Sequence, residues 1–256
     1  MKEDYKNINI LVIGDSCEDV FVYGHVYRLA PEGPVPVFNP HMEKSNGGMA
    51  LNVKHNIDAI GANSTLVTQC EQIYKTRYVD ARTNMLLLRV DTNDKATRIT
   101  KDLLESITNN VYGDITYDAI IVSDYCKGYL LEEDIEFLGA NNKNVFLDTK
   151  KILGDWCKKV SYIKINHTEF DRTKHTIDKL NILDKLIITR SDEGCEYKDV
   201  IYPVEKVNIK DVSGAGDTFI SGLVSEYIRT NDIGMAIKFA QHCATIVVQK
   251  KGVCTI

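Results

Sequence analysis

Eight consecutive residues, Asp-Val-Ser-Gly-Ala-Gly-Asp-Thr at positions 211–218, carry the clearest chemical signal in this sequence. Small residues at a helix start let backbone N–H groups approach an anion, and the helix dipole favours negative charge there. Asp217 among these donors would repel a bound phosphate, which favours a site that needs a base beside a phosphoryl group. The octet therefore predicts phosphoryl transfer from a nucleotide to a hydroxyl. An ordinary helix start, capped by Ser213 with Asp217 complementing the dipole, is the alternative.

The elements around this octet must form a strand, a loop and a helix. Residues 207–209 (Val-Asn-Ile) predict a strand before it, and 219–228 repeat apolar residues at helical spacing after it. Elsewhere short apolar strands alternate with helices, which predicts a mostly parallel, doubly wound α/β sheet. Further strands are expected at 8–13, 64–68, 119–123, 145–148, 162–165 and 186–189. Helices are expected near 97–109, 131–140, 168–179 and 232–248, with another opening at Gly47-Gly48.

A small β-layer is expected beside this sheet. A Pro-rich loop at 31–40 runs into an edge strand, and 77–79 and 85–90 predict a hairpin around 82–84. We expect the layer to be built from segments near 20–45 and 75–92, within a single domain spanning 1–256.

Composition excludes several classes of protein. The 256 residues are 44% hydrophobic with a net charge of −5 and no basic run, so a large core is expected and nucleic acid is not an expected partner. The polar N-terminus and the lack of a long apolar stretch predict neither a signal peptide nor a membrane span. Seven cysteines without metal-site spacing favour reduced thiols in a cytoplasmic protein. No P-loop or protein-kinase motif occurs.

Polar residues follow the predicted strands at the edge where such sheets bind ligands. Asp15 and Asp19 could accept hydrogen bonds from sugar hydroxyls or serve turn chemistry. Gly47 and Gly48 permit close approach of a polyol, with Asn52 one turn further on, or they are a simple loop-to-helix junction.

Three further clusters have the same ambiguity. Lys127 could bind phosphate or lie in a solvated loop. Asn166 and Glu169 could organise hydrated Mg²⁺ or simply start a helix. Residues 189–194 could contact a nucleotide or form a tight turn.

Taken together, the ordered motifs resemble the ribokinase-like (PfkB) carbohydrate kinases, most closely their D-glycero-β-D-manno-heptose-7-phosphate kinase branch. The resemblance implies an α/β, ribokinase-like doubly wound, mostly parallel sheet with a small β-sheet lid. The matching stretches include Val12-Ile13-Gly14-Asp15, Arg28-Leu29-Ala30-Pro31-Glu32-Gly33-Pro34-Val35-Pro36-Val37, Gly47-Gly48, Ser123-Asp124-Tyr125-Cys126-Lys127-Gly128, Asp148-Thr149-Lys150, 166–169, Thr189-Arg190-Ser191 and 211–218.

The resemblance also implies roles. ATP with Mg²⁺ would lie across the sheet edge, and Asp217 would deprotonate the anomeric hydroxyl of heptose 7-phosphate beside an anion hole of Gly214, Ala215 and Gly216. Asn166 and Glu169 would help place Mg²⁺ indirectly, and a homodimer would form through the lid. The implied substrate-binding residues are Asp15, Asp19, Arg28, Gly47, Gly48, Asn52, Asp124 and Lys127. The implied nucleotide-binding residues are Asn166, Glu169, Thr189, Arg190, Ser191, Gly194, Ser213 and Gln241.

Departures from the family pattern keep alternatives open. Val67-Thr68 leads almost directly to Lys75-Thr76-Arg77, where the family has a further loop, helix and strand near the substrate lid. Residues 239–245 differ from the family near the adenine, and no nucleotidyltransferase domain follows residue 252, so at most a kinase is expected. The acceptor could be another sugar or sugar phosphate, or the chain could be a catalytically weak relative that binds nucleotide or sugar.

Overall fold

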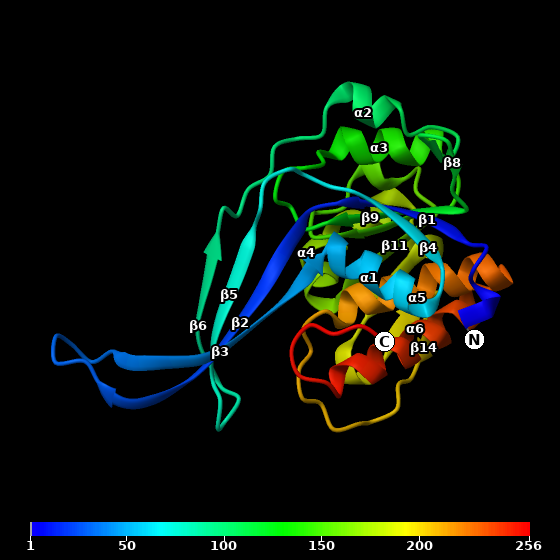
Figure 1. Cartoon of the computed structure of the whole chain (residues 1–256). Coiled ribbons are helices and arrows are strands. Elements are labelled where there is room, and N and C mark those ends of the chain that lie inside the picture. The colour runs from blue at the N-terminus through cyan, green and yellow to red at the C-terminus, as the bar shows by residue number, and fades with distance from the viewer. Residues whose placement is uncertain (1) are drawn as a thin grey trace.

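The computed structural model describes residues 2–256, and its centre is an eight-stranded sheet between two layers of helices (Figure 1). Six neighbouring strands run parallel, and two antiparallel strands extend one edge. In spatial order the strands are β14 (Val200–Tyr202), β13 (Cys195–Tyr197), β12 (Leu186–Thr189), β11 (Tyr162–Asn166), β10 (Val145–Thr149), β9 (Ala119–Asp124), β1 (Asn9–Gly14) and β4 (Asn63–Val67).

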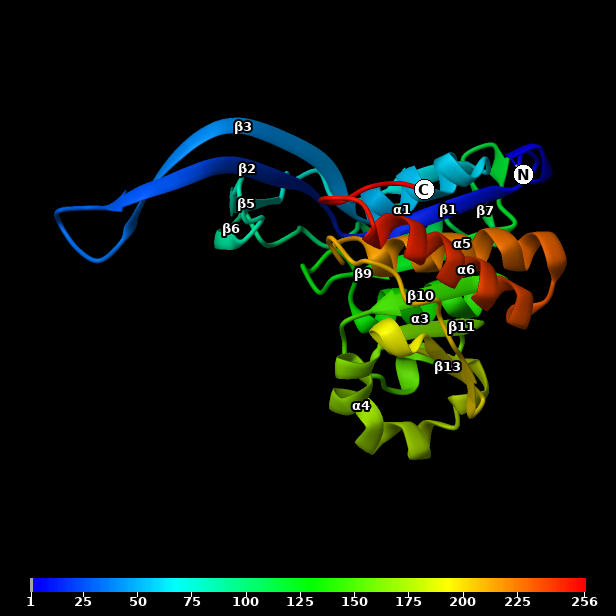
Figure 2. The ribbon, with the colours of Figure 1, turned by 90° about the horizontal axis from the view of Figure 1, so that it is seen from below.

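Helices cover both faces of this sheet (Figure 2). One face carries α1 (Ala50–Ile60), α5 (Ala215–Thr230) and α6 (Ile233–Val248), and the other carries α2 (Lys101–Glu105), α3 (Glu132–Asn141) and α4 (His167–Leu180). The remaining short elements are the 3-10 turns Lys2–Asp4, Asp155–Cys157, Leu183–Lys185 and Ser191–Glu193 and the strand pair β7 (Val111–Tyr112) and β8 (Ile115–Thr116). None of the helices formed by residues 2–256 combines the length and the apolar character needed to cross a bilayer.

Successive residues of the buried strands face opposite helical layers, because side chains alternate along a strand. In β1, Leu11 and Ile13 belong to the core that contains residues of α3 and α4, whereas Ile10 and Val12 belong to the core of α1, α5 and α6. This two-sided burial explains why the strands are short, continuous apolar runs.

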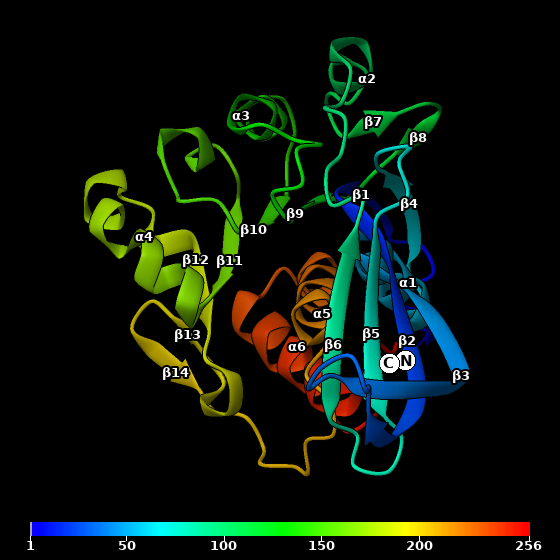
Figure 3. The ribbon, with the colours of Figure 1, turned by 90° about the vertical axis from the view of Figure 1, so that its left-hand side faces the viewer.

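The second sheet projects from the body as a lid (Figures 1 and 3). Its strand order is β3 (Pro36–Met49), β2 (Ser16–Leu29), β5 (Tyr74–Asp80) and β6 (Leu86–Thr92). One residue, Asp15, separates β1 from β2, so the chain passes directly from the main sheet into the lid. The far ends of β2 and β3 continue beyond β5 and β6 as a two-stranded ribbon (Figure 1).

The predicted fold class and the predicted parallel strands are confirmed, with strand ends within one residue of the expected positions. The hairpin forms as β5–β6 and the edge strand forms as β3, which begins at Pro36, within the predicted loop 31–40.

Three local predictions are wrong. Only 101–105 of the predicted helix 97–109 is helical, because the preceding segment runs extended beside the loop after β9, with Ile99 N–H donating to Tyr129. Gly47 and Gly48 lie in strand β3, paired with Glu18 and Cys17. The strand ends at Met49 and the helix begins at Ala50. Residues 207–209 form no strand, since the sheet already ends at β14 and this segment lines a cavity instead.

Replacing Gly14 with alanine should destabilise the main sheet, because the added Cβ would lie 1.9 Å from the carbonyl oxygen of Ser123 on β9. We expect the free energy of unfolding to fall by about 1–3 kcal/mol, the usual cost of overpacking. Urea denaturation followed through the fluorescence of the buried Trp156 would measure the loss.

Gly33→Ala is the matched control, because nothing lies within 4 Å of a Cβ at that position. Its effect should stay within about 0.5 kcal/mol, as for ordinary surface substitutions. Equal losses in the two variants would contradict the close approach of β1 and β9.

Candidate active site

A cavity of about 590 Å³ lies at the carboxyl edge of β11 and β12, against the start of α5. This volume is in the range of about 300–1,000 Å³ typical of ligand pockets. Its wall includes the loop that was predicted to be a strand, through Val204, Val207 and Ile209, and the inner side of α6 through Gln241 and Ala244.

The glycine loop of the octet forms one wall of this cavity. Gly214, Ala215 and Gly216 all line it, and α5 begins at Ala215. Gly214 has φ +80°, and a Cβ there would lie 2.7 Å from Nδ2 of Asn52, so both backbone and space favour glycine. Because the first amides of a helix lack intrahelical partners, this wall is suited to an anion.

Asp217 lies in the first turn of α5 and is 3% exposed. Its Oδ1 accepts a hydrogen bond from the Tyr125 hydroxyl at 2.6 Å, and its Oδ2 accepts one from Asn52 Nδ2 at 2.9 Å. Asn52 in α1 is itself held by Asn56, whose Nδ2 donates to Asn52 Oδ1. Burial raises the pKa of Asp217 to about 6, while the two hydrogen bonds oppose this rise. A carboxylate with such a pKa is a competent base near neutral pH.

A lysine that the sequence motifs did not assign lies at the same wall. Lys164 on β11 faces the α5 side of the sheet, and its Nζ lies 2.9 Å from the position of a Cβ on Gly216. It pairs with Asp148 Oδ2 on the neighbouring strand at 2.7 Å, with both side chains 7% exposed. A lysine inside an otherwise apolar buried strand is the sequence signal that could have identified it.

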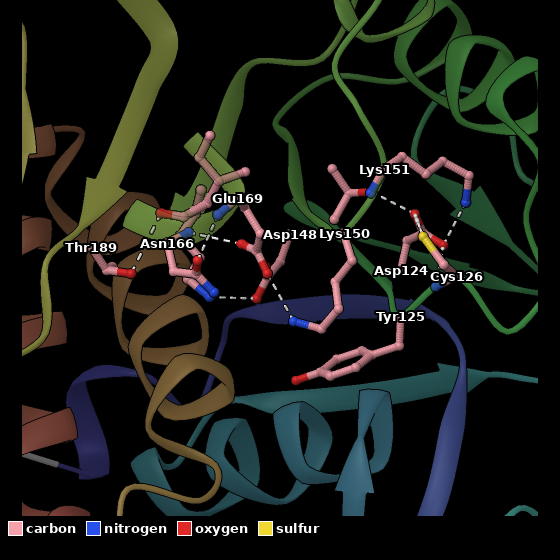
Figure 4. Close-up of polar contacts among 12 residues, drawn as sticks. Asp124, Tyr125, Cys126, Asp148, Lys150, Lys151, Asn166, Glu169 and Thr189 are labelled. Atoms are coloured by element: carbon pink, nitrogen blue, oxygen red, sulfur yellow. Dashed lines mark hydrogen bonds and ion pairs between the residues drawn. The ribbon is translucent and has the colours of Figure 1, made fainter. Parts of the chain in front are cut away.

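A second lysine connects the cavity wall to the start of α4 (Figure 4). Lys150 Nζ donates to Glu169 Oε1 at 2.9 Å and lies 4.6 Å from the centre of the Tyr125 ring. Asn166 caps α4: its Oδ1 accepts from Glu169 N–H at 2.9 Å, and Glu169 Oε2 accepts from Asn166 N–H at 2.8 Å. These two hydrogen bonds form the capping box of an ordinary helix start, which was the alternative interpretation of Asn166 and Glu169. Asn166 also lines the cavity.

Two aspartates predicted to bind substrate hold the loop after β9. Asp15 is 1% exposed and accepts hydrogen bonds from the backbone N–H groups of Tyr125, Lys127 and Tyr129. Asp124 accepts from the Thr149 hydroxyl, the Lys151 ammonium and the Cys126 N–H (Figure 4). Their contacts position Tyr125, and sugar binding by either residue stays a prediction.

The other predicted substrate residues are spread over the lid and the loop after β9. Asp19 forms an ion pair with Arg77, and a Cβ on Gly48 would meet Asp19 Oδ2, so these residues lie together. Lys127 pairs with Asp94 at 2.5 Å. Arg28 is exposed near the far end of the β2–β3 ribbon, away from Asp217.

The predicted nucleotide residues divide into two groups. Thr189, Ser191, Gly194, Gln241 and Asn166 line the cavity. Three others do not line it: Arg190 pairs with Glu196, the backbone N–H of Ser213 donates to Asp211, and Glu169 pairs with Lys150.

The shortened connection from β4 to β5 is well packed. Gln69 Oε1 accepts from Ser16 N–H at 3.0 Å and its Nε2 donates to Ser16 O at 2.7 Å, as a neighbouring strand would. Ile73 is 1% exposed and packs with Cys17 and Met49. The lid therefore keeps a defined position although the connection is only 68–73.

Comparison with known proteins gives matches over most of the chain. Residues 68–256 match the pfkB family of carbohydrate kinases. The protein named bifunctional protein HldE from Hydrogenovibrio crunogenus is 28% identical over 299 aligned positions, covering 99% of this chain and 62% of the relative. The protein of the same name from Helicobacter pylori is 29% identical, covering 95% of this chain and 63% of the relative. The chain thus spans about 62% of the length of these curated relatives.

Solved structures show the same fold. A nucleoside kinase from Methanocaldococcus jannaschii, an archaeal member of the ribokinase family, has a TM-score of 0.68 at 17% identity and covers 97% of this chain and 94% of its own. Arabidopsis thaliana ribokinase complexed with ribose and ATP has a TM-score of 0.66 at 11% identity, covering 96% and 94%. The fold is therefore ribokinase-like.

Tyr125→Phe should raise the pKa of Asp217 further. The variant removes a hydrogen bond that favours the ionised carboxylate, and one such bond corresponds to about one pKa unit. The carboxyl titration, followed by ¹³C NMR and assigned with an Asp217→Asn sample, should move from about 6 to higher pH.

Tyr129→Phe is the matched control, since the Tyr129 hydroxyl is buried without a hydrogen-bond partner among residues 2–256. It should leave the titration of Asp217 unchanged. A Tyr125→Phe titration that coincides with that of the parent protein would refute the contact.

Proposed function

The chain belongs to the pfkB family of carbohydrate kinases, and we propose that it phosphorylates the anomeric hydroxyl of D-glycero-D-manno-heptose 7-phosphate with ATP. The product would be the 1,7-bisphosphate. The observation that carries phosphoryl transfer is the buried Asp217 carboxylate beside the glycine wall of the cavity. The choice of acceptor is supported by the motifs that resemble heptose-7-phosphate kinases and by the similarity to HldE proteins.

In the proposed reaction the acceptor oxygen attacks the terminal phosphorus of ATP, and its proton passes to Asp217. The bond from that phosphorus to the leaving ADP oxygen breaks as the new bond forms. Asn52 and Tyr125 hold the carboxylate in place. The N-terminus of α5 and the Lys164 ammonium would stabilise the charge on the transferring group.

Magnesium ion, when bound, would neutralise charge on the nucleotide phosphates. Within residues 2–256 no group of three His, Cys, Asp or Glu side chains is placed to hold a metal. The Glu169 carboxylate is already shared between Lys150 and Asn166 N–H. This donor set fits a hydrated ion held mainly by phosphates and water, with Asn166 and Glu169 contacting it indirectly.

Asp217→Asn should abolish turnover. Removing a general base lowers rates by about 10²–10⁴-fold. ADP release with Mg-ATP and heptose 7-phosphate, compared with a panel of other sugars, would measure it. The variant should remain folded, because asparagine removes a charge whose burial already raises the pKa of Asp217.

Each outcome of this assay has a distinct meaning. Heptose-phosphate-dependent turnover that is lost in the variant supports both chemistry and acceptor. Turnover with a different sugar alone keeps the chemistry and replaces the acceptor. Nucleotide binding without turnover on any sugar would favour the catalytically weak relative.

A homodimer through the lid belongs to the same proposal. Leu88 and Val90 pair in register with Tyr78 and Thr76 on β5 and are 56% and 40% exposed, so they form a short apolar row on one face of the lid. Rows of this kind, next to the free edge of β6, are typical of surfaces that another chain covers.

Leu88→Asp should convert the dimer to monomers, since each interface would gain two buried carboxylates by symmetry. Size-exclusion chromatography with light scattering would give the mass. Val200→Asp on β14, an equally exposed position at the far edge of the body, is the matched control. A parent protein that is monomeric at high micromolar concentration would disprove this part of the proposal.

A further inference from the structure

One buried cation of the lid has no carboxylate partner. Lys75 on β5 is 7% exposed, and no ion pair to it is formed within residues 2–256. Its Nζ lies 2.8 Å from Met49 Sδ and 5.1 Å from the centre of the Tyr125 ring. It is also close to Cys17, whose thiol is neutral because burial raises its pKa to about 12. Its in-register neighbours Asp19 and Asp91 carry charge, but neither lies within ion-pair distance of the ammonium, and each pairs with an arginine.

The neighbouring cations of the lid and of the loop after β9 are all paired. Each has its own aspartate, so their charges cancel, and among these four cations only Lys75 lacks a carboxylate in ion-pair contact. The pairs are Arg77–Asp19, Arg89–Asp91 and Lys127–Asp94.

The position of Lys75 is fixed by the lid framework. It pairs in register with Asp19 across β2 and β5, and Glu18 N–H donates to Ile73 O at 2.8 Å just before it. Gln69 ties the start of the segment to β2. The ammonium is thus held in place by the lid strands and does not sample solvent freely.

Lys75 and Asp217 both contact Tyr125. The Lys75 ammonium contacts it at the ring, and the Asp217 carboxylate contacts it at the hydroxyl, which donates to Asp217. A sugar phosphate carries its anomeric hydroxyl and its phosphate at opposite ends of one sugar.

From this arrangement we propose that Lys75 binds the phosphate group of a phosphorylated sugar acceptor and thereby selects it over the unphosphorylated sugar. A buried ammonium without a counter-charge is costly, and a dianionic ligand offsets that cost. An ammonium with three donors is suited to phosphate oxygens. The inference rests on the proposed function, and it replaces Arg28 and Lys127 as the residue that meets the phosphate.

The test separates phosphate recognition from turnover. Heptose 7-phosphate and free heptose would be titrated calorimetrically into Asp217→Asn protein, with and without Lys75→Met. Methionine has a side chain of similar length and suits the contacts with Met49 and the Tyr125 ring, so folding should be preserved. We expect affinity for the phosphorylated sugar to fall by about 10- to 100-fold, the value of one charged hydrogen bond. Affinity for free heptose should not change.

Lys44→Met in the same background is the matched control, because Lys44 is an exposed lysine on lid strand β3. It should alter neither affinity. Equal weakening of both sugars by Lys75→Met, no weakening, or no binding of any sugar phosphate would each overturn the inference. Selective weakening would sustain it even if the ADP-release assay showed no turnover, in which case only the proposed function would fail.

Discussion

The ionised carboxylate of Asp217, buried where α1, α5 and the loop after β9 meet, is the constraint on which the rest of the site depends. Raising its pKa from 3.8 to about 6 means that ionising it in the folded state costs about 3 kcal/mol. The folded chain therefore loses stability as the pH rises through about 6, and the surrounding structure must offset that loss. Two hydrogen bonds and the N-terminus of α5 oppose the cost directly.

These two hydrogen bonds need a framework that is itself fixed by buried polar contacts. Asn52 is held by Asn56 within α1, and Tyr125 belongs to a loop whose amides converge on Asp15. Asp15 is the single residue between β1 and β2. The same residue therefore joins the main sheet to the lid and shapes the loop that carries Tyr125. Its carboxylate can be buried because the backbone N–H groups of that loop satisfy it.

The sequence was sufficient for the parallel strands, because two-sided burial leaves short apolar runs that stand out between polar loops. It was also sufficient for the glycine loop, where small residues and an aspartate occur together. It could not identify Tyr125 and Asn52 as partners of Asp217, since 92 and 165 positions separate them and only the folded sheet brings them together. The predicted strand at 207–209 was wrong, because the β propensity of a segment does not reveal whether a partner strand exists.

The lid shows how a shortened chain can keep a functional geometry. In place of a longer connection, the side chain of Gln69 bonds to both backbone groups of Ser16, and Ile73 fills the space beside Met49. Strand β5 is thereby fixed against β2, with its inner face towards Tyr125. Because that ring also contacts Lys150 at the cavity wall and its hydroxyl donates to Asp217, one residue lies between the lid, the cavity and Asp217. The connection between β4 and β5 can therefore be short without separating these three parts. Their relative position is set by the Tyr125 ring and its contacts, and not by the length of the connection.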